Sequence, residues 1–155
     1  MFYSILKLVH ILAILLWVGG MIFAHCFLRP AVGTLEPPQR LRLLRDVLSR
    51  FLNAVLGAVV LVLVTGAWMI GRVARQVVET GGSFQMPHAW ITMAVLGVIM
   101  AAIFGHIRFA LYPRLNRAVQ ANDWPAGGVA MQSLKTWVTV NLVLGLLTIA
   151  VIVLG

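Results

Sequence analysis

Four histidines are the residues of this chain whose type and placement could carry chemistry. They are His10, His25, His88 and His106, and each lies in or at the edge of a strongly apolar segment. An imidazole inside a bilayer costs so much free energy that a functional role is the default hypothesis for it. Neutral imidazole binds both copper and haem iron, so these positions indicate metal chemistry.

The composition identifies the surroundings of these histidines. Hydrophobic residues make up 61% of the 155 residues, charged residues make up 10%, and the mean hydropathy is +0.99. Four segments, 2–28, 47–70, 87–112 and 134–154, are long and apolar enough to cross a bilayer core of about 30 Å. The sequence therefore predicts an all-α polytopic membrane protein. We expect residues 1–155 to form a single domain, a bundle of four transmembrane helices with the lipid bilayer as its partner.

The basic residues indicate how these spans are oriented. The net charge is +8, and the cations gather in or beside the first and third connections: Arg29, Arg40, Arg42, Arg45, Arg50, Arg108, Arg114, Arg117 and Lys135. The opposite side has only Lys7, Arg72 and Arg75. The positive-inside rule therefore predicts a bacterial inner-membrane protein with both termini in the periplasm. No basic stripe with interleaved aromatic residues is present, so nucleic acid is not an expected partner.

Depth along the helices sorts the histidines into two layers. His10 lies about 10 Å below the outer boundary and His25 about 22 Å further along the same span. His88 lies at the mouth of the third span and His106 about 27 Å deeper. At 100° per residue His88 and His106 share one face, and His10 and His25 differ by about 60°. We therefore expect each helix to turn both of its histidines toward a common interior.

Two metal chemistries suit imidazoles placed in this way. Copper, as Cu(I), also favours thioethers, and Met21 precedes His25 by one helical turn while Met86 precedes His88 at the outer mouth. Haem b would be clamped between facing histidines of two helices, with the glycines of the first and third spans as space for a flat ring.

The other polar residues suggest structural roles. Asn53 of the second span and Asn141 of the fourth are expected to hydrogen-bond across helices, and Met93 and Met100 lie away from the histidine face, as packing residues do. No serine nucleophile with a base, no carboxylate pair and no phosphate loop is present. The sequence favours a protein that is not an enzyme, and any enzymatic chemistry would be that of a haem-dependent oxidoreductase.

Parts of the chain resemble the copper resistance protein D (CopD-like) membrane family. The first predicted span resembles the first helix of that family at Leu6-Lys7-Leu8-Val9-His10, Trp17, Gly19, Gly20 and Leu28-Arg29-Pro30. Its second helix is similar to Ser49-Arg50-Phe51 through Val64-Thr65-Gly66, and its last to Val140-Asn141-Leu142 through Gly145. The resemblance implies copper uptake or resistance at the bacterial inner membrane, which is a class of function rather than a defined reaction.

The first helix also resembles that of the HemJ-type protoporphyrinogen oxidases, small four-helix proteins that bind haem b. His10, Trp17 and Gly20 match that pattern, and His106 matches a histidine late in their third helix. A lysine expected in the first half of that helix is missing, since Trp90-Ile91-Thr92-Met93 occupies the region. The resemblance implies haem binding, and the departure argues against the oxidase activity.

These observations predict a CopD-like protein that handles or transports copper. The predicted ligands, from the outside inward, are Met86, His88, His10, Met21, His25 and His106. One alternative is a haem b redox protein in which a histidine of the first span faces one of the third. Another is a structural or assembly subunit whose histidines only hydrogen-bond. Four helices make a narrow bundle, so a homodimer is compatible with the sequence, although no residue pattern specifies it.

Overall fold

The computed structural model describes residues 1–154 and contains four long helices, two of which, the first and the third, change helix type along their length. The first consists of α1 (Phe2–Ile14), η1 (Leu15–Gly19), α2 (Gly20–Phe23), η2 (Ala24–Leu28), α3 (Arg29–Ala31) and η3 (Val32–Thr34). The second is α4 (Pro37–Glu79). The third consists of α5 (His88–His106), η4 (Ile107–Leu111) and α6 (Tyr112–Gln120), and the fourth is α7 (Trp124–Leu154). The described residues form no strand, so the all-α prediction is confirmed.

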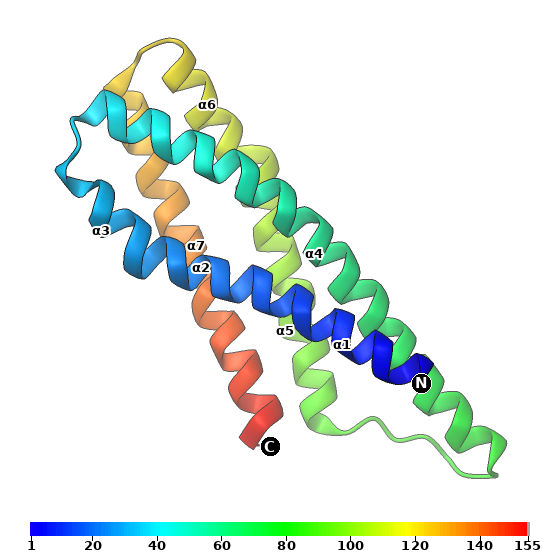
Figure 1. The fold of residues 1–155 in the computed structure, drawn as a ribbon. Coiled ribbons are helices and arrows are strands. Elements are labelled where there is room, and N and C mark those ends of the chain that lie inside the picture. Colours follow the sequence, from blue (N-terminus) through cyan, green and yellow to red (C-terminus); the bar gives the residue numbers. More distant parts are fainter. Residues whose placement is uncertain (155) are drawn as a thin grey trace.

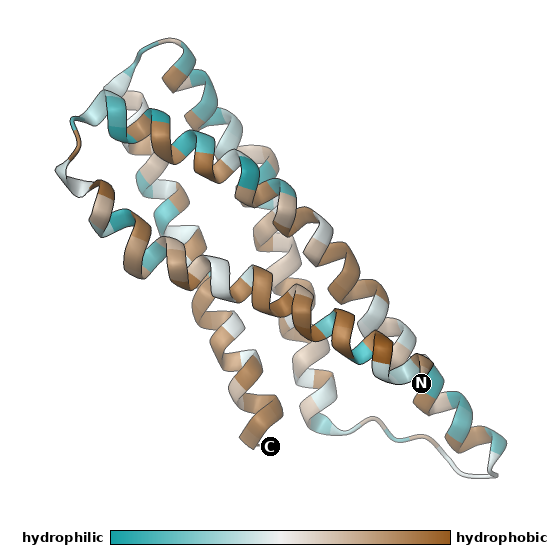
Figure 2. Ribbon diagram, viewed as in Figure 1, coloured by the Kyte–Doolittle hydropathy of each residue, from teal (hydrophilic) through white to brown (hydrophobic). Residues whose placement is uncertain are grey.

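Each helix is long and apolar enough to cross a membrane, and each contains one predicted span. The helices run beyond the predicted spans; α4, with 43 residues, is about 64 Å long at 1.5 Å per residue. Because a bilayer core is about 30 Å thick, the ends of α4 must project from it. Figure 2 shows the result: polar residues gather on α6, on the first turns of α4 and again near its end, and apolar residues occupy the middle of the bundle.

The helices run up and down, so that alternate connections lie at the same end (Figure 1). The N-terminus, the end of α7 and the connection between α4 and α5 share one end of the molecule. The connection from η3 to α4 and the one from α6 to α7 share the other. The two basic connections therefore lie at the same end, as the charge pattern predicts; that this end is cytoplasmic stays a prediction.

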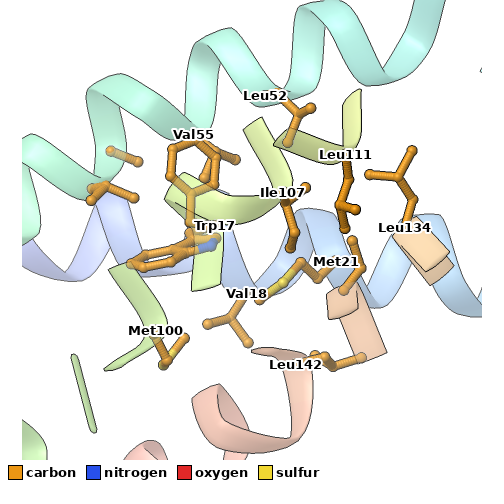
Figure 3. Close-up of a cluster of buried hydrophobic side chains, with 14 of the residues drawn as sticks. Trp17, Val18, Met21, Leu52, Val55, Met100, Ile107, Leu111, Leu134 and Leu142 are labelled. Carbon is orange, nitrogen blue, oxygen red and sulfur yellow. The ribbon is translucent and has the colours of Figure 1, made fainter. Parts of the chain in front are cut away.

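The core fills the space among the four helices with large apolar side chains (Figure 3). Trp17 packs edge-on against Phe104, with ring centroids 6.1 Å apart. Gly145 of α7 allows close approach, because a Cβ at this position would lie 3.0 Å from a methyl of Val18 and 3.1 Å from the methyl of Met100. Met100 is buried, so its expected packing role is confirmed.

Candidate functional site

His10 is the histidine that the structure holds between two helices within the predicted bilayer. It lies on α1 and is half-buried, and its Nδ1 lies 2.8 Å from Oγ1 of Thr65 on α4. Thr65 is one of two buried polar residues in the described chain, with 5% of its surface exposed. The ring lies over Gly66, where an added Cβ would stand 3.3 Å from His10 Cε1. Thr65 and Gly66 therefore form a seat for the imidazole.

His25 lies on η2 near the end with the basic connections, and it faces α7 rather than α4. Its Nδ1 is 3.3 Å from Nη1 of Arg29 and 3.5 Å from Oγ1 of Thr139. A guanidinium N–H can only donate a hydrogen bond, so His25 Nδ1 accepts it and its lone pair is occupied. In this conformation only Nε2 of His25 could bind a metal.

His106 is exposed and packs edge-on against Trp137 of α7, with ring centroids 5.2 Å apart. Trp137 lies two residues before Thr139, the neighbour of His25, which confirms that His25 and His106 share a layer. Two residues of an α-helix differ by about 200° around its axis. The two histidines therefore lie on opposite sides of α7 and do not face each other.

His88, at the first position of α5, is exposed, and Met86 before it is half-buried. On α5 the positions between the two histidines that share their face, Val95, Ile99 and Ala102, are also exposed. The shared face of His88 and His106 is thus confirmed, but the expectation that it points into the bundle is wrong. Because α5 is apolar on all sides, its sequence has no periodicity that selects the inward face.

On the first helix, His10 and His25 also fail to face a common interior, and the reason is different. Between His10 and His25 the chain passes through the π-helical segment η1 and enters a second one, η2. A π-helix makes i→i+5 hydrogen bonds and so has more residues per turn than an α-helix, which shifts the phase of all later residues. His10 consequently contacts α4 and His25 contacts α7.

The predicted ligands are therefore not assembled into one cluster. Residues 1–154 contain no group of three or more His, Cys, Asp or Glu placed to hold a metal ion, and no hydrogen bond or ring contact in that range joins two histidines. Met21 is buried among core side chains, with 2% of its surface exposed. This arrangement does not fit a haem clamped between facing histidines.

The two asparagines behave differently from each other. Asn53 Oδ1 accepts a hydrogen bond of 2.9 Å from Nη2 of Arg108 on η4, so the expected contact across helices is confirmed. Asn141 is 1% exposed, and its Oδ1 has no hydrogen-bond partner within residues 1–154. A buried carbonyl oxygen without a donor is costly.

Sequence reasoning missed Thr65 and Gly66 as partners of His10. A signal for them was present, because a hydroxyl residue followed by glycine lies within the apolar part of the neighbouring span at a similar depth. Hydroxyl residues in membrane helices are common, however, since they can bond to their own backbone. Only the pairing of α1 with α4 separates this threonine from the others.

Four membrane-length helices and an imidazole held between two of them define a multi-pass membrane protein with a polar site inside its bundle. The model of the copper resistance protein D family matches residues 45–154, well over half of the chain. The chain belongs to this family, and its class is that of a copper-resistance membrane protein. No curated protein and no solved structure matches it. The matched region includes Thr65, Gly66, His88 and His106 but not the first helix, which carries His10 and His25.

Proposed function

We propose that this protein binds copper within the bacterial inner membrane and transports it, with both termini in the periplasm. Family membership supports copper as the cargo. The observation that carries the proposal is the seat of His10, an imidazole bonded to the buried Thr65 at a depth of about 10 Å. A nitrogen ligand is rarely placed in a bilayer without a function.

The proposed ligands lie at successive depths. Met86 and His88, at the start of α5, would receive the ion at the periplasmic end, and His10 would bind it inside the bundle. Met21, His25 and His106 would bind it in separate places nearer the cytoplasm. Soft thioether ligands favour Cu(I), and imidazole also binds copper. Ligands spread along a path suit an ion that must also leave. The proposal therefore does not require the closed cluster of a structural metal site.

The test compares two variants of neighbouring residues on α1. Purified protein in lipid nanodiscs would be titrated with Cu(I) against a chromogenic chelator, and copper tolerance would be measured in cells that depend on the protein. His10→Ala should lose Cu(I) affinity by at least about tenfold and should lose tolerance. Lys7→Ala, which changes an exposed residue one turn away, should match the unchanged protein.

Two results would overturn the proposal. One is wild-type copper affinity in His10→Ala. The other is a purified protein that binds no copper and shows the Soret band of bound haem in its visible spectrum.

A further inference from the structure

The hydroxyl of Thr65 determines which nitrogen of His10 carries the proton. Thr65 Oγ1 donates its single hydrogen within α4, to the carbonyl oxygen of Leu61, with that of Val62 at 3.4 Å. This bond to the residue one turn earlier is the usual one for threonine in a helix. The oxygen can then only accept from His10 Nδ1, 2.8 Å away. The imidazole must therefore donate, so the proton lies on Nδ1.

A neutral imidazole has one N–H, so the Nε2 of His10 carries a lone pair. The hydrogen bond to Thr65 engages Nδ1 and leaves Nε2 outside it. A Cβ at Gly66 would lie 3.3 Å from Cε1 and 3.9 Å from Nδ1, so the glycine makes room for the ring edge that faces Thr65, and Nε2 is not among the atoms that such a Cβ would meet. Histidines that bind metals generally donate their other ring N–H to an acceptor, which fixes the tautomer and the ring orientation. Thr65 places His10 in that state before any ion arrives.

A soft side chain lies one turn from this seat. Met69 follows Thr65 by four residues on α4, which places it about 6 Å along the axis and about 40° around it. It is half-buried. Two contacts between α1 and α4 lie on either side of it: His10 with Thr65 one turn before, and Phe2 with Arg72 three residues after, where the guanidinium carbon is 5.9 Å from the ring centroid. Met69 therefore lies in the same seam between the helices, on the periplasmic side of His10.

We propose that His10 Nε2 and Met69 Sδ are the two ligands of an intramembrane Cu(I) site, with Thr65 as the residue that positions His10. The inference rests on the proposed function. One nitrogen and one thioether sulfur form a soft, neutral pair that favours Cu(I) over the harder divalent ions. Arg72, whose guanidinium carbon lies 5.9 Å from the ring of Phe2, closes the periplasmic end of the seam.

The role of Thr65 is tested first in the metal-free protein. ¹⁵N chemical shifts of labelled histidines, in nanodiscs, report the tautomer of His10. Thr65→Ser keeps the acceptor and should keep Nδ1–H, whereas Thr65→Val should lose this preference and bind Cu(I) about 10–100-fold more weakly. Thr148→Val is the matched control, because Thr148 is half-buried and its hydroxyl also donates one turn back, to Leu144. An unchanged tautomer in Thr65→Val would overturn the positioning role.

The role of Met69 is tested by X-ray absorption of the Cu(I)-loaded protein. With the other proposed sulfur ligands removed by Met21→Leu and Met86→Leu, the protein should show one sulfur and one nitrogen scatterer, and adding Met69→Leu should lose the sulfur and keep the nitrogen. Met93→Leu, which changes a half-buried methionine of α5, should keep both. A sulfur scatterer that persists in Met69→Leu overturns the ligand pair. If the unchanged protein binds no copper, the proposed function fails, and the tautomer measurement still decides the role of Thr65.

Discussion

His25 and His106 lie in the same layer of the bundle and on opposite sides of α7. His25 Nδ1 is 3.5 Å from Thr139 Oγ1, and the ring of His106 packs against Trp137, with centroids 5.2 Å apart. Residues that are placed at one depth but contact different faces of an intervening helix cannot share an ion. Any metal bound near this end of the molecule must use the two imidazoles independently.

Because the two histidines are separated, we expect the effects of substituting them to be additive. The effects of His25→Ala and His106→Ala on the free energy of Cu(I) binding should sum in the double variant to within about 0.5 kcal/mol, as distant sites do. A double-mutant cycle from competition titrations measures the coupling. A coupling above about 1 kcal/mol would mean that the two rings meet at one ion, contrary to the observed packing.

Gly66 should be required for copper binding rather than for folding. In Gly66→Ala the new Cβ would lie 3.3 Å from His10 Cε1, so the ring must move by a few tenths of an ångström, and this shift should disturb its hydrogen bond to Thr65. We expect a loss of Cu(I) affinity of about tenfold with little change in stability. Gly57→Ala is the control, since no atom lies within 4 Å of its added Cβ. Equal Cu(I) affinity in Gly66→Ala and Gly57→Ala would contradict the role of Gly66 in holding the His10 ring.

Gly145 should be required for stability. The Cβ of Gly145→Ala would meet Val18 and Met100 at 3.0 and 3.1 Å, and both side chains are buried. Overpacking of this kind costs about 1–3 kcal/mol. Unfolding in a denaturing detergent, monitored by circular dichroism, gives the change. Gly97→Ala, with no neighbour within 4 Å, should unfold as the unchanged protein does.

Substituting leucine for each of the two asparagines should have different effects on stability. Asn141→Leu removes a buried oxygen that has no donor in the described chain, so the change should be neutral or stabilising. Asn53→Leu removes the acceptor of the 2.9 Å bond from Arg108 and should cost about 1–3 kcal/mol. The same detergent titration measures both variants. Marked destabilisation by Asn141→Leu would show that its side chain has a partner that the single chain lacks.

The four membrane helices and the gathering of the basic connections at one end follow from the amino-acid sequence alone. Both properties are local, because hydropathy over about 20 residues decides whether a segment enters a bilayer and the charges of short loops bias its direction. The placement of His88 and His106 on a common helix face is also a local property, because their spacing within one regular α-helix sets it.

The neighbour of each histidine, in contrast, depends on how the four helices pack against one another. The third helix is apolar on all sides, and lipid solvates apolar side chains as well as a helix interface does, so no pattern marked its inward face. The π-helical segments shifted the phase of the first helix, and the pairing of α1 with α4 placed Thr65 and Gly66 under His10. These relations depend on contacts between spans far apart in the sequence. The four similar histidines of the sequence are therefore one seated imidazole and three that lie apart from it.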